Sequence, residues 1–320
     1  MEYITLGKTQ SKVSKISLGT WSYGGASTSG NQSVGWADQD DSDSKKALLK
    51  AYDLGINHWD TADVYGDGRS ESIIGKMWKE VSRNEIFLAT KVGWDMGSYD
   101  HWYHPSKMIE NMERSLNNLN TECVDLMYLH HCNFGKNEEF FDDALDVLTK
   151  FLESGKTKFI GLSDWSDKKI MQYIDRVSPD VVQPYRNVMD DSYEISGLKN
   201  YIDSNNVGVC FFSPIKHGLL TGKYKKPPKF KDGDYRKNVE AFNNQEIIDL
   251  LLTNKEKLSD RFSNHSQPVM HGLISPILED APTGCVLLGQ RNEEQVVKAS
   301  QLGDGISKED AEWVKKLYKF

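Results

Sequence analysis

The chain has 320 residues, and its 39 Lys and Arg against 47 Asp and Glu give a formal net charge of -8 at pH 7. A negative protein repels nucleic acid phosphates and anionic membrane surfaces, so we expect neither as a partner. The start of the chain has no apolar signal segment, and no run of about 18 apolar residues occurs anywhere, so we expect a soluble, cytoplasmic protein. Barrels of alternating strands and helices commonly reach this length as one unit, so we expect a single domain over residues 1–320.

A polar hairpin is predicted first, with one strand near Tyr3 and the other from Val13. Short β-rich runs then alternate with longer segments of helical apolar spacing. The helical segments include residues 44–54, 71–79 and 106–119, the last with Ser106 as its N-cap. Eight strands are predicted, at residues 16–21, 57–62, 86–92, 124–130, 158–163, 181–187, 207–213 and 285–289.

Strands that alternate with helices indicate a parallel sheet whose outer face is covered. An open doubly wound sheet would carry a GxGxxG turn after its first strand, and the stretch from Gly19 to Gly25 lacks that spacing. The sequence therefore predicts an α/β fold, a (β/α)8 TIM barrel with an N-terminal β-hairpin and extended C-terminal loops. Residues 224–268, rich in Lys, Asp and Asn, are predicted to hold a lid loop and helices.

The cysteines give no sign of a metal knuckle or a disulfide framework, because none of the four forms a CxxC pair. We interpret them as reduced thiols. His130, His131 and Cys132 are adjacent, but neighbouring strand residues point to opposite faces, so both histidines are not expected to reach one ion. No metal site is predicted.

Four ionisable residues fall at or just after the ends of successive predicted strands: Asp60, Tyr65, Lys91 and His130. Reactive groups in such barrels come from these positions. Each residue alone has an ordinary structural explanation, as a turn residue, a half-buried aromatic or a solvated lysine. Their joint occurrence at one end of the barrel favours a common site.

These residue types suit carbonyl reduction. A hydride that reaches a carbonyl carbon leaves an oxygen that needs a proton, and a phenol of pKa about 10 is a weak proton donor until it is tuned. An ammonium favours the phenolate, a buried carboxylate keeps the ammonium charged, and an imidazole can bind the carbonyl oxygen.

The segment Asp60-Thr-Ala-Asp-Val-Tyr65-Gly66 resembles the signature of the aldo-keto reductase family, and Thr90-Lys91-Val92 and residues 124–130 continue the match in order. The resemblance covers nearly the whole chain and is nearest to the longer microbial and potassium-channel-β-subunit-like branches. It implies that Tyr65 is the general acid–base, that Asp60 and Lys91 tune it, and that His130 orients the substrate carbonyl.

The resemblance also implies a nicotinamide cofactor, NADPH with NADH possible, and Arg291 would meet the 2′-phosphate. Asp164 replaces a usual Asn and Arg186 a usual stacking aromatic, and we expect these two to form an ion pair. The usual adenine-reading pair falls at Lys298 and Ala299. The expected cofactor-binding residues are Thr20, Trp21, Ser163, Asp164, Gln183, Arg186, Ser213, Pro214, Gly218, Leu220, Gly222, Lys223, Gly289, Arg291 and Gln295.

The expected substrate is a small-molecule aldehyde, ketone or sugar, because aromatic side chains follow the first and third predicted strands. The predicted substrate-binding residues are Trp21, Tyr23, Trp94, Trp102 and His131. Two alternatives stay open: a cofactor-binding regulatory subunit with little turnover, and a barrel lyase or hydrolase that uses Asp60 and Lys91 without nicotinamide. The chain is expected to be a monomer or a small homo-oligomer.

Overall fold

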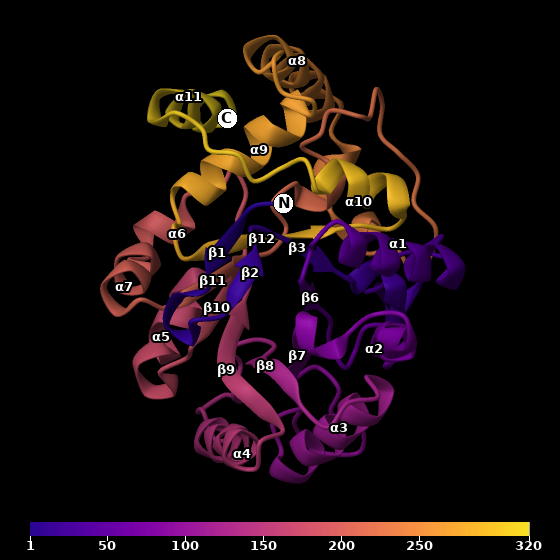
Figure 1. The fold of residues 1–320 in the computed structure, drawn as a ribbon, viewed down its shortest axis with the longest axis vertical. Helices are drawn as coiled ribbons and strands as arrows, with labels where there is room; N and C mark the ends of the chain where they lie inside the picture. The colour runs from indigo at the N-terminus through magenta and orange to yellow at the C-terminus, as the bar shows by residue number, and fades with distance from the viewer. Residues whose placement is uncertain (320) are drawn as a thin grey trace.

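The computed structural model describes residues 1–319 and contains a closed barrel of eight parallel strands (Figure 1). This architecture confirms the predicted fold class, and each predicted strand overlaps one barrel strand. The strands follow one another around the barrel in chain order, and pairing of Val286 with Ile16 closes it. The strands are β3 (Ile16–Gly19), β6 (His58–Asp60), β7 (Phe87–Val92), β8 (Val124–Leu129), β9 (Thr157–Asp164), β10 (Val181–Pro184), β11 (Gly208–Phe211) and β12 (Gly284–Gly289).

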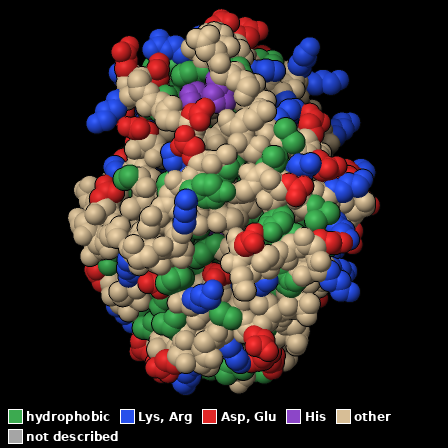
Figure 2. Space-filling model, viewed as in Figure 1, with side chains coloured by type: hydrophobic (Ala, Val, Ile, Leu, Met, Phe, Trp, Pro, Cys, Tyr) green, Lys and Arg blue, Asp and Glu red, His purple; other side chains and the backbone are tan. Residues whose placement is uncertain are grey.

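Helices surround the barrel and cover its outer face (Figure 1). They are α1 (Asp41–Asp53), α2 (Arg69–Gly75), α3 (Pro105–Asn118), α4 (Phe141–Glu153), α5 (Asp167–Val177), α6 (Ser192–Ile195), α7 (Leu198–Asn205), α8 (Gln245–Arg261), α9 (Pro268–Glu279), α10 (Glu293–Ala299) and α11 (Lys308–Leu317). Among residues 1–319, no helix combines the length and apolar character that crossing a bilayer requires. Figure 2 shows basic and acidic side chains interspersed over one face of the molecule.

The predicted N-cap of the third helical segment is wrong. Helix α3 begins at Pro105, with His104 as its N-cap, so Ser106 lies inside the first turn. Proline is favoured at the first helical position because its fixed φ suits the helix and its missing N–H needs no partner there.

The predicted N-terminal hairpin is present as β1 (Tyr3–Thr5) and β2 (Lys12–Ser14), which pair antiparallel. It lies in front of the barrel strands in Figure 1. The turn packs tightly against the start of β11: a Cβ on Gly7, whose φ is +47°, would lie 2.2 Å from the Gly208 nitrogen. Leu6 is fully buried among interior side chains of the barrel. The hairpin thus covers the N-terminal end of the barrel, opposite the ends where strand-terminal side chains gather.

The stretch predicted to hold a lid and helices contains α8 and, before it, a segment that is fastened to the loop after β3. We call residues 233–236 the strap. The Tyr235 nitrogen donates to Gly35 O at 2.9 Å, and the Ala37 nitrogen donates to the Asp234 carboxylate at 3.1 Å. Arg236 binds the same carboxylate at 2.6 Å and lies over the Trp36 ring. Two loops far apart in sequence are therefore joined above the C-terminal end of the barrel.

Candidate active site

Asp60, Tyr65 and Lys91 lie together at the C-terminal end of the barrel. The Lys91 Nζ atom donates to Asp60 Oδ1 at 2.5 Å, to the Thr61 carbonyl at 2.7 Å and to the Tyr65 hydroxyl at 3.3 Å. Register explains the contact, because β6 and β7 are paired neighbours and both side chains point into the barrel. The Lys91 and Asp60 side chains are each only 1% exposed. Strand ends thus bring an ammonium, a carboxylate and a phenol to one point.

Burial and the neighbouring charges together keep the lysine protonated and the phenol neutral. Burial alone would lower the pKa of Lys91, but the Asp60 carboxylate and Tyr65 together outweigh burial, so the pKa is raised. Burial raises the pKa of Tyr65, and the opposing effect of the Lys91 ammonium is smaller. We expected the ammonium to make the phenol more acidic. That contribution has the expected sign, but the net shift is upward, and the hydroxyl holds its proton firmly.

His130 follows β8 and faces the same group. Its ring lies 5.8 Å from the Tyr65 ring, centroid to centroid, in an edge-to-face arrangement. Burial, with help from Lys91 and His131, holds the pKa of His130 well below its usual value. The imidazole is therefore neutral at pH 7, and its Nδ1 atom is buried without a hydrogen-bond partner. A neutral imidazole can donate one hydrogen bond to an oxygen in the mouth of the barrel.

The ends of β9 and β10 add polar side chains beside this group. Ser163 and Gln183 are register partners, and Gln183 donates to the second Asp60 oxygen at 2.8 Å. The Asp164 carboxylate accepts from the backbone nitrogens of Cys132 at 2.7 Å and Ser166 at 2.8 Å. Asp164 therefore ties the loops after β8 and β9 together.

The predicted ion pair between Asp164 and Arg186 is wrong. The Arg186 guanidinium instead binds Glu194 on α6 at 2.6 Å and Asp280 just after α9 at 2.7 Å, both outside the barrel. Side chains alternate along a strand, and Gln183 points inward, so Arg186 points outward. It is 3% exposed and does not present its guanidinium to the mouth as a stacking surface.

The aromatic rings that do lie at these strand ends are Tyr185 and Phe212, which we did not predict. Tyr185 is two residues beyond Gln183 and shares its inward side, and Phe212 directly precedes Ser213. Their rings are 5.7 Å apart, and both contact Trp165, at 5.3 and 4.8 Å. Strand alternation counted from Gln183 would have identified Tyr185.

A cluster of aromatic side chains extends from these rings across the mouth to the strap. Tyr235 lies 5.1 Å from Trp21 and is stacked on Trp165 at 6.1 Å, while His217 lies 5.1 Å from Tyr235. Trp21 in turn lies 6.2 Å from Tyr65. Trp21, one of the residues predicted to bind substrate and cofactor, therefore lies beside Tyr65. Trp165 and Tyr235 were missed as lining residues, although Tyr235 lies in the stretch predicted to hold a lid loop.

Tyr23 is not a pocket residue, contrary to our expectation. It is fully buried, and its hydroxyl donates to Gln290 O at 2.8 Å. It belongs to the short helical turn Trp21–Gly24, which turns Trp21 outward and Tyr23 into the core. Thr20 is likewise fully buried and donates to Asp60 O at 2.8 Å, so its hydroxyl supports the strand ends.

Trp94, Trp102 and His131 form an aromatic wall beside His130. Trp94 is 49% exposed and lies 4.2 Å from His131, which also contacts Trp102 at 4.7 Å. His131 itself is only 4% exposed, so it supports Trp94 from behind. The wall therefore offers the indole of Trp94 to a ligand near His130.

The loop after β11 has an unusual backbone. Ser213, Lys216 and His217 all have positive φ, at 60°, 46° and 57°. Such conformations cost free energy for residues with a side chain and concentrate at functional sites. This loop also holds other predicted cofactor-binding residues. Of these, Pro214, Gly218, Leu220 and Gly222 are buried, and Lys223 is exposed.

A cavity of about 310 Å³ lies outside the barrel next to Arg291 and Gln295. The Arg291 guanidinium binds Gln39 at 2.9 Å and the carbonyls of Ala37 and Asp38. Gln295 accepts from the Arg291 nitrogen at 2.9 Å. Gly289 is exposed with open space beside it. Arg291 and Gln295, two of the predicted cofactor-binding residues, thus line one opening, while Lys298 pairs with Glu294 on the surface.

Comparison with known proteins identifies relatives over nearly the whole chain. A sequence model of the Aldo/keto reductase family matches residues 15–318. The chain is 29% identical over 308 residues to the aldo-keto reductase YhdN of Bacillus subtilis, covering 94% of this chain and 88% of that protein. It is 27% identical to a probable voltage-gated potassium channel subunit beta of Oryza sativa, covering 93% and 90%. The structure of a glycerol dehydrogenase from Gluconobacter oxydans superposes with a TM-score of 0.81 at 25% identity, covering 98% and 94%.

Proposed function

We propose, from the premise that the chain belongs to the aldo/keto reductase family, that this oxidoreductase interconverts a carbonyl and its alcohol with Tyr65 as the general acid–base. One observation carries the proposal: the Tyr65 hydroxyl lies 3.3 Å from a buried ammonium that is itself held by Asp60. Tyr65 is protonated at neutral pH, and it can give that proton to a developing alkoxide because an alkoxide is a much stronger base than a phenolate and the Lys91 ammonium stabilises the phenolate left behind.

Each of the four residues has a distinct task in this proposal. Tyr65 gives its proton to the carbonyl oxygen during reduction and takes one from the alcohol during oxidation. The Lys91 ammonium stabilises the phenolate that is left behind, and Asp60 keeps that ammonium charged and oriented. His130, neutral at pH 7, donates a hydrogen bond that positions the carbonyl oxygen.

The proposed cofactor is NADPH, with NADH as the other candidate; when bound, its nicotinamide supplies or accepts the hydride. Several observations fit a dinucleotide. Ser163 and Gln183 present polar groups to a ring, the Tyr185 and Phe212 rings offer flat surfaces, and the strained loop from Ser213 connects them to the outer rim. The cavity at Arg291 carries a guanidinium, which can hold a 2′-phosphate. Arg186 is not included, because its guanidinium is engaged outside the barrel.

The proposed substrate is a small aldehyde, ketone or sugar. Trp21 and Trp94 present aromatic faces on two sides of the Tyr65 and His130 pair. Indole faces bind the C–H surfaces of polyols and sugars, and the tyrosine and histidine supply hydrogen bonds. The relative from Gluconobacter oxydans is named a glycerol dehydrogenase, which is consistent with this class.

Replacement of Tyr65 by phenylalanine tests the proposal. We expect Tyr65→Phe to lower kcat by a factor of about 100 to 10,000, the range of general acid–base catalysis, and to leave the Kd for the cofactor nearly unchanged. Tyr52→Phe is the matched control, because Tyr52 hydrogen-bonds Glu85 on an exposed surface. The assay follows nicotinamide absorbance with aldehydes, ketones and sugars in both directions. Turnover of Tyr65→Phe equal to that of the control would refute the assignment.

A second candidate is a regulatory subunit that binds cofactor but turns over little. The similarity to the probable channel subunit beta of Oryza sativa favours it, since 90% of that protein is covered. The same assay separates the two functions. Cofactor binding without turnover across a broad carbonyl panel would support the regulatory candidate and refute the catalytic one.

A further inference from the structure

A group of polar and sulfur-containing side chains lies in the barrel interior below Asp60, toward the N-terminal hairpin. It consists of Ser17 from β3, His58 from β6, Cys210 from β11 and Cys285 from β12, and all four are fully buried. Interior layers of such barrels are usually filled by branched aliphatic side chains. His58 is two residues before Asp60 on the same strand, so the group lies one layer beneath the candidate active site.

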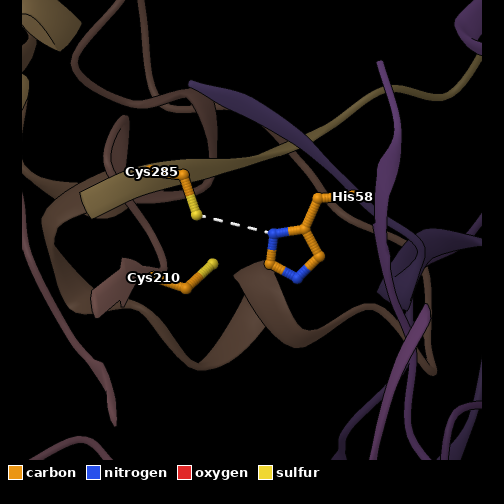
Figure 3. Close-up of side chains that lie close together, drawn as sticks. All are labelled: His58, Cys210 and Cys285. Atoms are coloured by element: carbon orange, nitrogen blue, oxygen red, sulfur yellow. Dashed lines mark hydrogen bonds between the residues drawn. The ribbon is translucent and has the colours of Figure 1, made fainter. Parts of the chain in front are cut away.

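The geometry of this group is that of a set of metal ligands. Figure 3 shows the two sulfurs and the imidazole pointing toward one another from three different strands. Cys210 and Cys285 are direct partners in the register of β11 and β12. The Cys285 Sγ atom lies 3.5 Å from His58 Nδ1, and one ligand atom from each of the three residues falls within 4.8 Å of the others. The Ser17 hydroxyl lies 2.9 Å from the same nitrogen.

Packing alone does not account for these residues. His58 Nδ1 is shared between Ser17 and Cys285, while its Nε2 atom is buried with no hydrogen-bond partner. A buried polar atom without a partner costs free energy, and aliphatic side chains would fill the same space without that cost. A metal ion on Nδ1 would not pair with Nε2, but its bonds to Nδ1 and to the two sulfurs would offset the cost of burying these polar side chains.

We propose that His58, Cys210 and Cys285 bind one Zn²⁺ ion, with the Ser17 hydroxyl as the fourth ligand. A tetrahedral zinc ion with Zn–S of about 2.3 Å and Zn–N of about 2.0 Å separates a sulfur from a nitrogen ligand by about 3.5 Å. The Cys285 to His58 distance already has this value. Cys210 needs only a side-chain adjustment to join them.

The charges of the proposed ligands favour a divalent cation. Two thiolates and one neutral imidazole balance a divalent cation, so the occupied site carries no net charge in an interior that penalises charge. Binding releases one proton from each cysteine thiol and leaves zinc in its divalent state, so no redox partner is needed. Calcium and magnesium prefer oxygen ligands, and a monovalent copper ion would leave one thiolate uncompensated. The site is independent of the proposed catalytic function.

The experiment measures zinc bound to the purified full-length chain after growth with zinc and removal of loosely bound ions by gel filtration. We expect about one zinc per chain in the wild type, and a loss of at least tenfold in Cys210→Ser and Cys285→Ser. Cys132→Ser is the matched control, since Cys132 is also buried but lies outside the group, and it should keep the metal. Cobalt substitution of the wild type gives a second reading, because two thiolate ligands produce an intense charge-transfer band in the near ultraviolet.

Zinc content far below one per chain in the wild type, with no cobalt band, would overturn the proposal. Equal zinc in the wild type, the two cysteine variants and the control would overturn it as well, because the metal would then lie elsewhere. A Cys210 to Cys285 disulfide in freshly isolated protein, seen as a loss of two mass units in the peptide pair, would also contradict the site. If a serine variant fails to fold, the cobalt spectrum of the wild type decides.

Discussion

Removal of Asp60 should destabilise the fold as well as the reaction. In Asp60→Asn the Lys91 ammonium stays 1% exposed and loses a carboxylate oxygen 2.5 Å away. At an effective dielectric constant of about 20, that attraction amounts to about 7 kcal/mol, against a desolvation cost of several kcal/mol for each ion. In the variant, the Lys91 ammonium still bears the desolvation cost of burial but no longer has the attraction to a carboxylate. We therefore expect the free energy of unfolding to fall by about 3–5 kcal/mol, with turnover lost.

The same reasoning predicts non-additivity. Lys91→Met strands the Asp60 carboxylate and should cost a similar amount, but the double variant removes both charges and should cost less than the sum. Urea denaturation, followed by tryptophan fluorescence and circular dichroism, measures the free energy of unfolding of the wild type, the two single variants and the double variant. Lys298→Met is the control, because its pair with Glu294 is exposed and should change stability by less than about 1 kcal/mol. Strictly additive losses, or an Asp60→Asn variant as stable as the control, would show that the pair is not a coupled buried unit.

Two further predictions concern pH and cofactor choice. Burial, with Lys169 and His101 nearby, lowers the pKa of His131 from 6.5 to about 3. Between these two pKa values, His131 is protonated in the unfolded chain but not in the folded one. The free energy of unfolding is therefore at its full value above pH 6.5 and falls as the pH is lowered, by about 2 kcal/mol at pH 5. Urea midpoints at pH 7.5 and pH 5 check this, and an unchanged pH dependence in His131→Gln would contradict it. Arg291→Met should raise the Kd for NADPH at least tenfold and that for NADH less than threefold; fluorescence titration with both cofactors measures this, and equal losses would exclude a phosphate role.

The barrel was predictable from sequence because its strands are short, buried and β-rich, and because each is followed by a helix. Asp60, Lys91 and His130 could be placed together for the same reason, since they mark the ends of successive strands. The errors came from details finer than this pattern. Arg186 was assigned to the mouth by counting residues, whereas strand alternation turns it outward and Tyr185 inward. Tyr23 was expected to bind substrate, because the short turn that buries it has no distinctive signal in the sequence.

Other features depend on contacts between distant segments and leave no local pattern. The strap meets the loop after β3 through Asp234 and Gly35, which are far apart along the chain. His58, Cys210 and Cys285 share no motif spacing, and only the closure of the barrel brings them together. The direction of the Tyr65 pKa shift also could not be predicted from the sequence. Burial raises this pKa by more than Lys91 lowers it, and the extent of burial is known only from the packed structure.

The place of β12 in the barrel bears on how the chain folds. It pairs with β11 on one side and with β3, near the start of the chain, on the other. Until residues 284–289 have been synthesised, β3 and β11 each expose a row of unpaired amide and carbonyl groups. Such strand edges can pair with strands of other chains. Completion of the ring is therefore a late, long-range event, and a truncation before Gly284 should leave an aggregation-prone open sheet.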